Sequence, residues 1–91
     1  MKMEPLLEEL EAAAAKLGVR LSYESLFDSV GGGGLCKVNG TYRIIIDKRS
    51  TVSEKVGTLA KALASLDTGG IFLSPGARAI VERYQVMSGR Q

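Results

Sequence analysis

Few side chains in this chain could perform chemistry, and Cys36, Asp47 and Lys61 are the main candidates. The sequence contains no histidine, so it lacks both the usual general base for a cysteine or serine nucleophile and the imidazole metal ligand. Cys36 lies in a predicted strand without an accompanying base, which favours a small buried hydrophobic residue over a reactive thiol. Asp47, like Glu54 and Asp67, lies at the end of a predicted element, where carboxylates act as caps. The residue types therefore predict no catalytic residue, no metal ligand and no cofactor.

The glycine run Gly31–Gly34 has the composition of a phosphate-binding loop. Such loops lead into a helix and carry a following Lys-Ser or Lys-Thr, whereas this run leads into a predicted strand. We therefore interpret it as a flexible or bulged entry to a hairpin, where glycine tolerates unusual backbone geometry. An alternative is a residual enzyme in which these glycines line a groove near Lys61, with Lys61, Asp47 or Cys36 as its reactive group.

Basic residues gather over positions 37–49, where Asp47 is the only acid and Tyr42 lies among them. Lysines and arginines bind phosphates and aromatic rings stack on bases, so a weak nucleic-acid surface is one interpretation. The basic side chains alternate between the two faces of the predicted hairpin, however, and the net charge of the chain is only +2. Both points favour a solvated rim over a nucleic-acid footprint. The predicted binding surface comprises Lys37, Tyr42, Arg43, Lys48, Arg49, Lys61 and Ser65.

The elements that must position these residues fit one α+β domain over residues 1–91. Hydrophobic periodicity predicts helices over 4–17, 52–67 and 75–87, a strand over 19–23, and either a short buried strand or an extended link over 71–73. Residues 24–30 are predicted to be an irregular connection, and residues 88–91 a frayed tail. Together with a hairpin, these elements predict a small antiparallel or mixed three-stranded sheet covered by helices.

Asn39-Gly40 is the clearest local signal, because these residues supply the two positive φ values of a type I′ turn. A two-residue turn pairs Val38 with Thr41, Cys36 with Arg43, and Leu35 with Ile44. Both faces of this hairpin become apolar away from the turn, so we expect that end to be sandwiched inside the protein.

Two short sequence motifs predict where helices begin. Thr51 and Glu54 have the spacing of a capping box. Ser74-Pro75 has the pattern of an N-cap residue followed by the first residue of a helix. The last helix places Ala77, Ile80, Val81, Tyr84 and Met87 on one face.

The blocks 33–40, 42–47 and 55–67 resemble the core of the ImmA/IrrE-type zinc metallopeptidases. That family carries Thr-Leu-Ala-His-Glu-Leu-x-His on the helix after its hairpin, and residues 58–65 of this chain read Thr-Leu-Ala-Lys-Ala-Leu-Ala-Ser. Lys61, Ala62 and Ser65 thus take the places of the first zinc ligand, the general base and the second zinc ligand. The resemblance implies a minimal zincin-like framework without zinc and without peptidase activity. The chain also resembles short bacterial proteins with a similar Gly-Gly-Leu-Cys block.

Composition and the missing catalytic set together predict a non-catalytic protein-binding or scaffolding module. The chain is 45% hydrophobic and 24% charged, its single cysteine cannot form an internal disulfide, and no apolar run is long enough for a membrane span. These features predict a soluble cytoplasmic protein. Small domains with thin cores often gain stability by association, so we expect a protein partner or a homodimer. The strand over 19–23 and the last helix, with Tyr84 and Met87, are the expected contacts.

Overall fold

The protein is described by a computed structural model, which defines residues 3–25 and 33–87. It is an α+β domain with the predicted order of elements. The helices are α1 (Glu4–Lys16), α2 (Val52–Ala64) and α3 (Pro75–Met87), and the strands are β1 (Arg20–Glu24), β2 (Gly33–Val38) and β3 (Thr41–Asp47). The predictions for residues 26–32, which include two of the four consecutive glycines, and for the tail 88–91 lie outside the described residues.

The sheet is mixed, with strand order β1-β3-β2. β1 runs parallel to β3, while β2 and β3 form an antiparallel hairpin. The predicted hairpin register is confirmed at every pair from Val38–Thr41 to Leu35–Ile44. Asn39 and Gly40 have φ values of 52° and 82°, as the type I′ turn requires.

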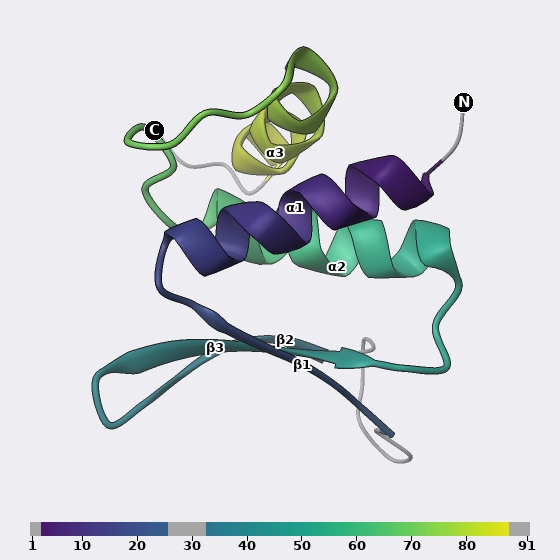
Figure 1. Cartoon of the computed structure of the whole chain (residues 1–91), viewed down its shortest axis with the longest axis vertical. Helices are drawn as coiled ribbons and strands as arrows, with labels where there is room; N and C mark the ends of the chain where they lie inside the picture. Colours follow the sequence, from purple (N-terminus) through teal and green to yellow (C-terminus); the bar gives the residue numbers. More distant parts are fainter. Residues whose placement is uncertain (1–2, 26–32, 88–91) are drawn as a thin grey trace.

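The two faces of the sheet differ in their surroundings. All described helices lie on one face (Figure 1), against which Ile44 and Ile46 are fully buried. Cys36 and Val38 point to the opposite face and are exposed. The described helices cover one face of the hairpin, and the burial predicted for the end far from the turn is confirmed on that face. On the other face at that end, Ile45 is half-buried.

Helix α1 begins with Pro5 in its first turn and buries Leu10, Ala13 and Ala14. Gly18 ends it with a φ of 76°, a conformation that glycine adopts without steric cost. The chain then turns back beneath α1 as β1. The predicted helix and strand are both confirmed within one residue at each end.

Helix α2 begins with the predicted capping box, in which the Thr51 hydroxyl accepts from the Glu54 amide and the Glu54 carboxylate accepts from the Thr51 amide. It ends at Ala64, three residues earlier than predicted. The Ser65 and Leu66 amides donate to carbonyls three residues back, and these tighter bonds close the last turn.

Residues 71–73 contain no strand, so they are the link of the two predicted alternatives, and the Ile71 amide donates to the Thr68 carbonyl. Leu73 is buried in the core, while Phe72 is 75% exposed. Ser74 then caps α3 as predicted, because its hydroxyl accepts from the Ala77 amide.

The elements form three layers (Figure 1). Helix α1 packs on β1, and α2 packs on β3 and β2. Helix α3 packs on α1 and α2, and within the described ranges it has no contact with the sheet. The core between the layers consists of Leu10, Ala13, Ala14, Val19, Ile44, Ile46, Val56, Leu59, Ala60, Ala62, Leu63, Leu73, Ala77 and Val81.

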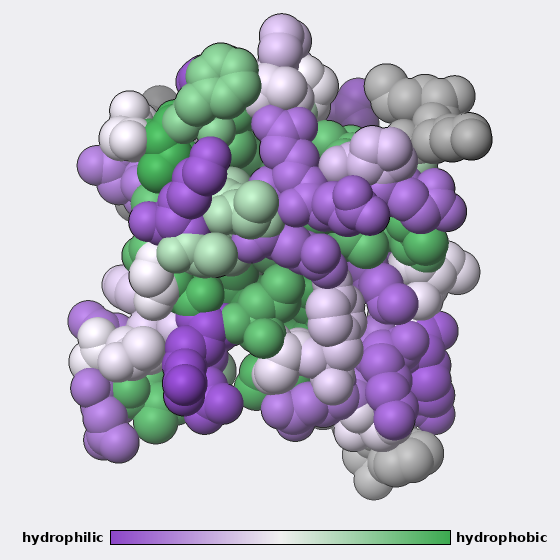
Figure 2. All heavy atoms as spheres, in the orientation of Figure 1, coloured by the Kyte–Doolittle hydropathy of each residue, from purple (hydrophilic) through white to green (hydrophobic). Residues whose placement is uncertain are grey.

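Two carboxylates of α1 tie the layers together. Glu9 accepts hydrogen bonds from the amide and the hydroxyl of Ser74, each 2.6 Å long, at the N-terminus of α3. Glu11 accepts a hydrogen bond from the Tyr23 hydroxyl on β1. Figure 2 shows hydrophilic side chains over the outward side of α1, with apolar atoms visible between α1 and β1.

Candidate functional site

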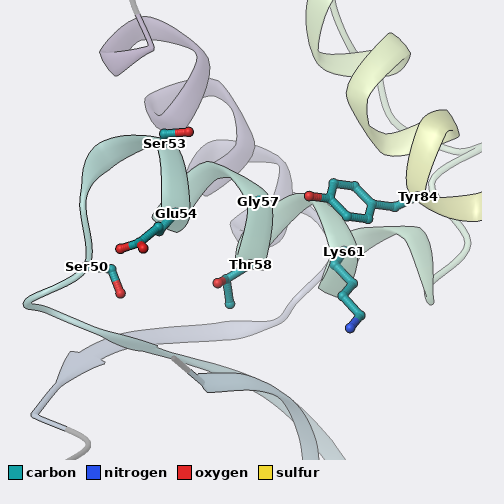
Figure 3. A pocket seen from close by; sticks show the side chains of 7 residues that line it. All are labelled: Ser50, Ser53, Glu54, Gly57, Thr58, Lys61 and Tyr84. Carbon is teal, nitrogen blue, oxygen red and sulfur yellow. The ribbon is translucent and has the colours of Figure 1, made fainter. Parts of the chain in front are cut away.

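A shallow groove of about 600 Å³ runs along one flank of α2. Its lining consists of Ser50, Ser53, Glu54, Gly57, Thr58, Lys61 and Tyr84. Figure 3 shows Glu54, Thr58 and Lys61 directed from α2 toward the sheet, with Tyr84 reaching in from α3 and α1 lying behind α2. Because α1 supplies none of the lining, the groove lies on the flank of α2 that faces away from α1.

The groove depends on a close approach between α2 and α3. A side chain at Gly57 would place its Cβ 3.1 Å from the Tyr84 hydroxyl. Glycine costs about 1 kcal/mol relative to alanine inside a helix. Here it leaves room for the Tyr84 hydroxyl beside α2. Sequence reasoning missed this contact, although an isolated glycine within a helical pattern is a signal for close packing.

The groove offers hydroxyl groups, one carboxylate and one ammonium. The Glu54 carboxylate already accepts from the Thr51 amide at 2.9 Å. Lys61 is exposed on the same flank, two helical turns further along α2. Among the described residues that line the groove there is no histidine or cysteine, and its polar groups can donate and accept hydrogen bonds.

Only part of the set proposed for a residual enzyme can be placed, because Gly31 and Gly32 lie outside the described residues. Lys61 lines the groove, whereas Asp47, Cys36 and Gly34 do not. Within residues 3–25 and 33–87, no cluster of three or more His, Cys, Asp or Glu side chains could hold a metal ion. Of the positions that correspond to the metallopeptidase motif, Lys61 and Ser65 are exposed and Ala62 is 5% exposed.

Cys36 is exposed, so the prediction of a buried hydrophobic residue is wrong. The strand itself is correct, and the error lies in the face. Cys36 is the partner of Arg43 across the hairpin, on the face of the sheet that the helices leave open. The Arg43 Nε is buried and has no hydrogen-bond partner among the described residues.

The residues of the predicted binding surface fall on separate parts of the molecule. Lys37 and Tyr42 are register partners near the hairpin tip, with the Lys37 ammonium 5.2 Å from the Tyr42 ring centroid. Arg43 follows on the opposite face of the sheet. Lys48 and Arg49 lie in the turn after β3, where the Arg49 guanidinium pairs with Asp47 at 3.3 Å. The structure thus divides the predicted binding surface between the hairpin tip, the turn after β3 and helix α2.

Two ionisable groups are shifted by contacts between layers. The hydrogen bonds from the Ser74 hydroxyl and amide hold the pKa of Glu9 below its ordinary value of 4.5. Burial, together with the hydrogen bond to Glu11, raises the pKa of Tyr23 above its ordinary value of 10.0. The Lys55 ammonium lies 5.3 Å from the Tyr23 ring centroid. Neither group lines the groove.

No family model, curated protein or solved structure matches this chain. The resemblance to the zinc metallopeptidases therefore stays a prediction. No helix in the described part of the chain combines the length and the apolar character needed to cross a bilayer.

Proposed function

We propose that this protein is a non-catalytic protein-binding module that takes up an extended protein segment at the free edge of β2. The observation that carries the proposal is the position of β2 in the sheet. It is an outer strand, and no described strand pairs with its other side. Strands at an edge present backbone donors and acceptors to which a further strand can pair.

The hairpin register defines which backbone groups are free. A two-residue turn makes Val38 and Thr41 a hydrogen-bonded pair, and such pairs alternate along an antiparallel ladder. Cys36 and Gly34 therefore use their backbone groups toward β3. The amides and carbonyls of Leu35 and Lys37 point to the open edge, in the spacing that an added strand matches.

The surroundings of this edge support a protein ligand. The half-buried Leu35 faces the helix layer, and Cys36 and the 43% exposed Val38 face the open side of the sheet. An added strand would cover apolar surface on both faces while pairing its backbone. The groove lies on the flank of α2 that faces away from α1, and α2 itself packs on β2, so we expect side chains of the added strand to reach it.

The test is a backbone substitution with a matched side-chain control. Lys37→Pro removes an outward amide, and proline is tolerated where an edge strand's N–H faces solvent. Lys37→Ala removes the same side chain and keeps the amide. We expect a protein captured by the wild type to be captured equally by Lys37→Ala and lost with Lys37→Pro. Equal capture by both variants would contradict binding at this edge.

A further inference from the structure

The two edges of the sheet differ in how the helices cover them. On one side α1 packs on β1, the outer strand itself. On the other side α2 packs on both β3 and β2. A helix above two strands lies about half a strand spacing, roughly 2.4 Å, inside the edge. The β2 edge is therefore set outward from its helix, and the β1 edge is not.

This lateral distance between an edge strand and the helix above it, here called the setback, determines which edge could pair with a copy of itself. Across a two-fold axis beside β2, a strand spacing of about 4.8 Å plus two setbacks brings α2 and its symmetry mate to about 10 Å. Packed helices lie about 8–10 Å apart. The same operation beside β1 would bring two copies of α1 to about 5 Å, which side chains do not allow. The geometry thus favours β2 over β1, the strand for which the sequence predicted this contact.

The charges along α2 are self-complementary under the same operation. Glu54 and Lys61 stand two helical turns apart, about 10 Å along the axis, at opposite ends of the groove (Figure 3). An antiparallel copy of α2 centred near Gly57 and Thr58 would place each Glu54 beside a Lys61 of the partner. The residues at the centre, Gly57 and Thr58, are small enough for close approach.

We propose that the segment bound at the β2 edge is β2 of a second copy of this chain, paired antiparallel across a two-fold axis. This inference rests on the proposed function and specifies its partner. The two sheets join into one of six strands, the outward amides and carbonyls of Leu35 and Lys37 pair between copies, and α2 packs along α2 of the partner. The groove described above becomes part of the interface.

The contact is small, since it consists of one strand edge and one polar helix flank. Stable dimers bury about 800 Å² on each partner, and smaller interfaces belong to weak or transient complexes. We therefore expect a dissociation constant of about 100 µM at low ionic strength. It should rise with added salt, because exposed charge pairs are screened.

The first experiment measures sedimentation equilibrium from about 10 µM to about 1 mM, a range that brackets this affinity. Lys61→Glu places like charges at both symmetric contacts, and we expect the dissociation constant to rise at least tenfold. Adding Glu54→Gln removes the repulsion and keeps the capping box, because glutamine serves there as well as glutamate. The double variant should therefore associate more tightly than Lys61→Glu alone. Arg78→Glu, an exposed position on α3, makes the same change of charge as the control and should associate like the wild type.

A second experiment uses the natural thiol as a distance probe. Cys36 lies at the centre of β2, so an antiparallel pair brings the two thiols close together near the two-fold axis. A short bismaleimide should link them into a covalent dimer in the wild type. The yield should fall with Lys37→Pro and Lys61→Glu and stay unchanged with Lys37→Ala and Arg78→Glu.

The outcomes separate this inference from the proposed function. A protein that stays monomeric up to about 1 mM, or a dimer insensitive to both Lys61→Glu and Lys37→Pro, overturns self-association at β2. If a different protein is still captured by the wild type and lost with Lys37→Pro, strand addition stands and only the identity of the partner is wrong. If both assays fail, the proposed function falls as well.

Discussion

Cys36 illustrates how far a single residue's surroundings depend on the face to which it points. Its exposure predicts rapid modification by a water-soluble disulfide reagent in the native protein, at a rate close to that in urea. Cys36→Ser should change the free energy of unfolding by less than about 0.5 kcal/mol, as is usual at exposed positions. A thiol that reacts only after unfolding would place Cys36 in the interior, contrary to this structure.

Substitutions at Gly57 test how tightly the Tyr84 side chain is held against α2. Gly57→Ala gains helix propensity, and its methyl group meets the far end of a half-exposed side chain that can shift by a few tenths of an ångström. We expect a net stabilisation of about 0.5 kcal/mol in urea unfolding, less than the full propensity gain. Gly57→Val should destabilise, because its branched side chain also enters the space of the ring. Destabilisation by alanine itself would show that Tyr84 is fixed in place.

Glu9 makes stability depend on pH. Its pKa is lower in the folded protein than its ordinary value of 4.5, because Ser74 donates two hydrogen bonds to it. A lowered folded pKa stabilises the protein above the unfolded pKa, and this contribution is lost as the pH falls through the folded pKa.

Glu9→Gln should therefore cost about 1 kcal/mol at neutral pH, a value reduced by partial exposure. Urea titrations should show the difference from the wild type shrinking as the pH drops below 4.5. Glu8→Gln, an exposed position on the same helix, is the control. A pH-independent difference would mean that the charge of Glu9 plays no part.

At the scale of elements, the capping box is the contact that fixes where α2 begins. Thr51→Ala removes the hydroxyl that accepts from the Glu54 amide at 3.1 Å, and we expect a loss of about 1 kcal/mol in urea unfolding. Ser53→Ala, two residues along on the same helix, should be nearly neutral because its hydroxyl is not the cap. Equal effects of the two substitutions would show that the box adds nothing beyond helix propensity.

Local chemistry predicted the elements well wherever a short motif defines them. Asn39-Gly40 predicted the hairpin and its register. Thr51 and Glu54 predicted where α2 begins, and Gly18 predicted where α1 ends. The end of α2 was predicted too late, because Leu66 continues the apolar periodicity after the backbone has left the helix. Periodicity reports which side chains are buried, and a half-buried residue in a following turn satisfies it equally.

For the whole molecule, the layer order predicts a gradient of protection. Helix α2 lies between the sheet and α3, whereas α3 is the outermost layer and packs only on helices within the described ranges. We expect amide hydrogen exchange to be slowest in β3 and the centre of α2, and faster in α3 by local opening. Glu9→Gln should speed exchange in α3 more than in β3. Equal rates in α2 and α3 would indicate that the three layers open as one unit.

The candidate site lay beyond sequence reasoning because it arises from packing between distant segments. The groove combines α2 with Tyr84, and the free edge of β2 follows from strand order. One sequence does not report which of three strands lies in the middle. The sequence predicted Lys61 and Ser65 as surface residues and the hairpin as an element, but it did not predict that the helices leave one sheet face open.

The strand order has a consequence for how the protein is made. β3 is the middle strand, yet it follows both of its neighbours in the sequence. During synthesis, β1 and β2 leave the ribosome before β3, the strand with which both must pair. The pairing of β1 with β3 also joins residues farther apart in the sequence than the β2–β3 hairpin does. The nascent chain therefore has no sheet until β3 has emerged, and until then the edges of β1 and β2 are open to chaperones and to other nascent chains.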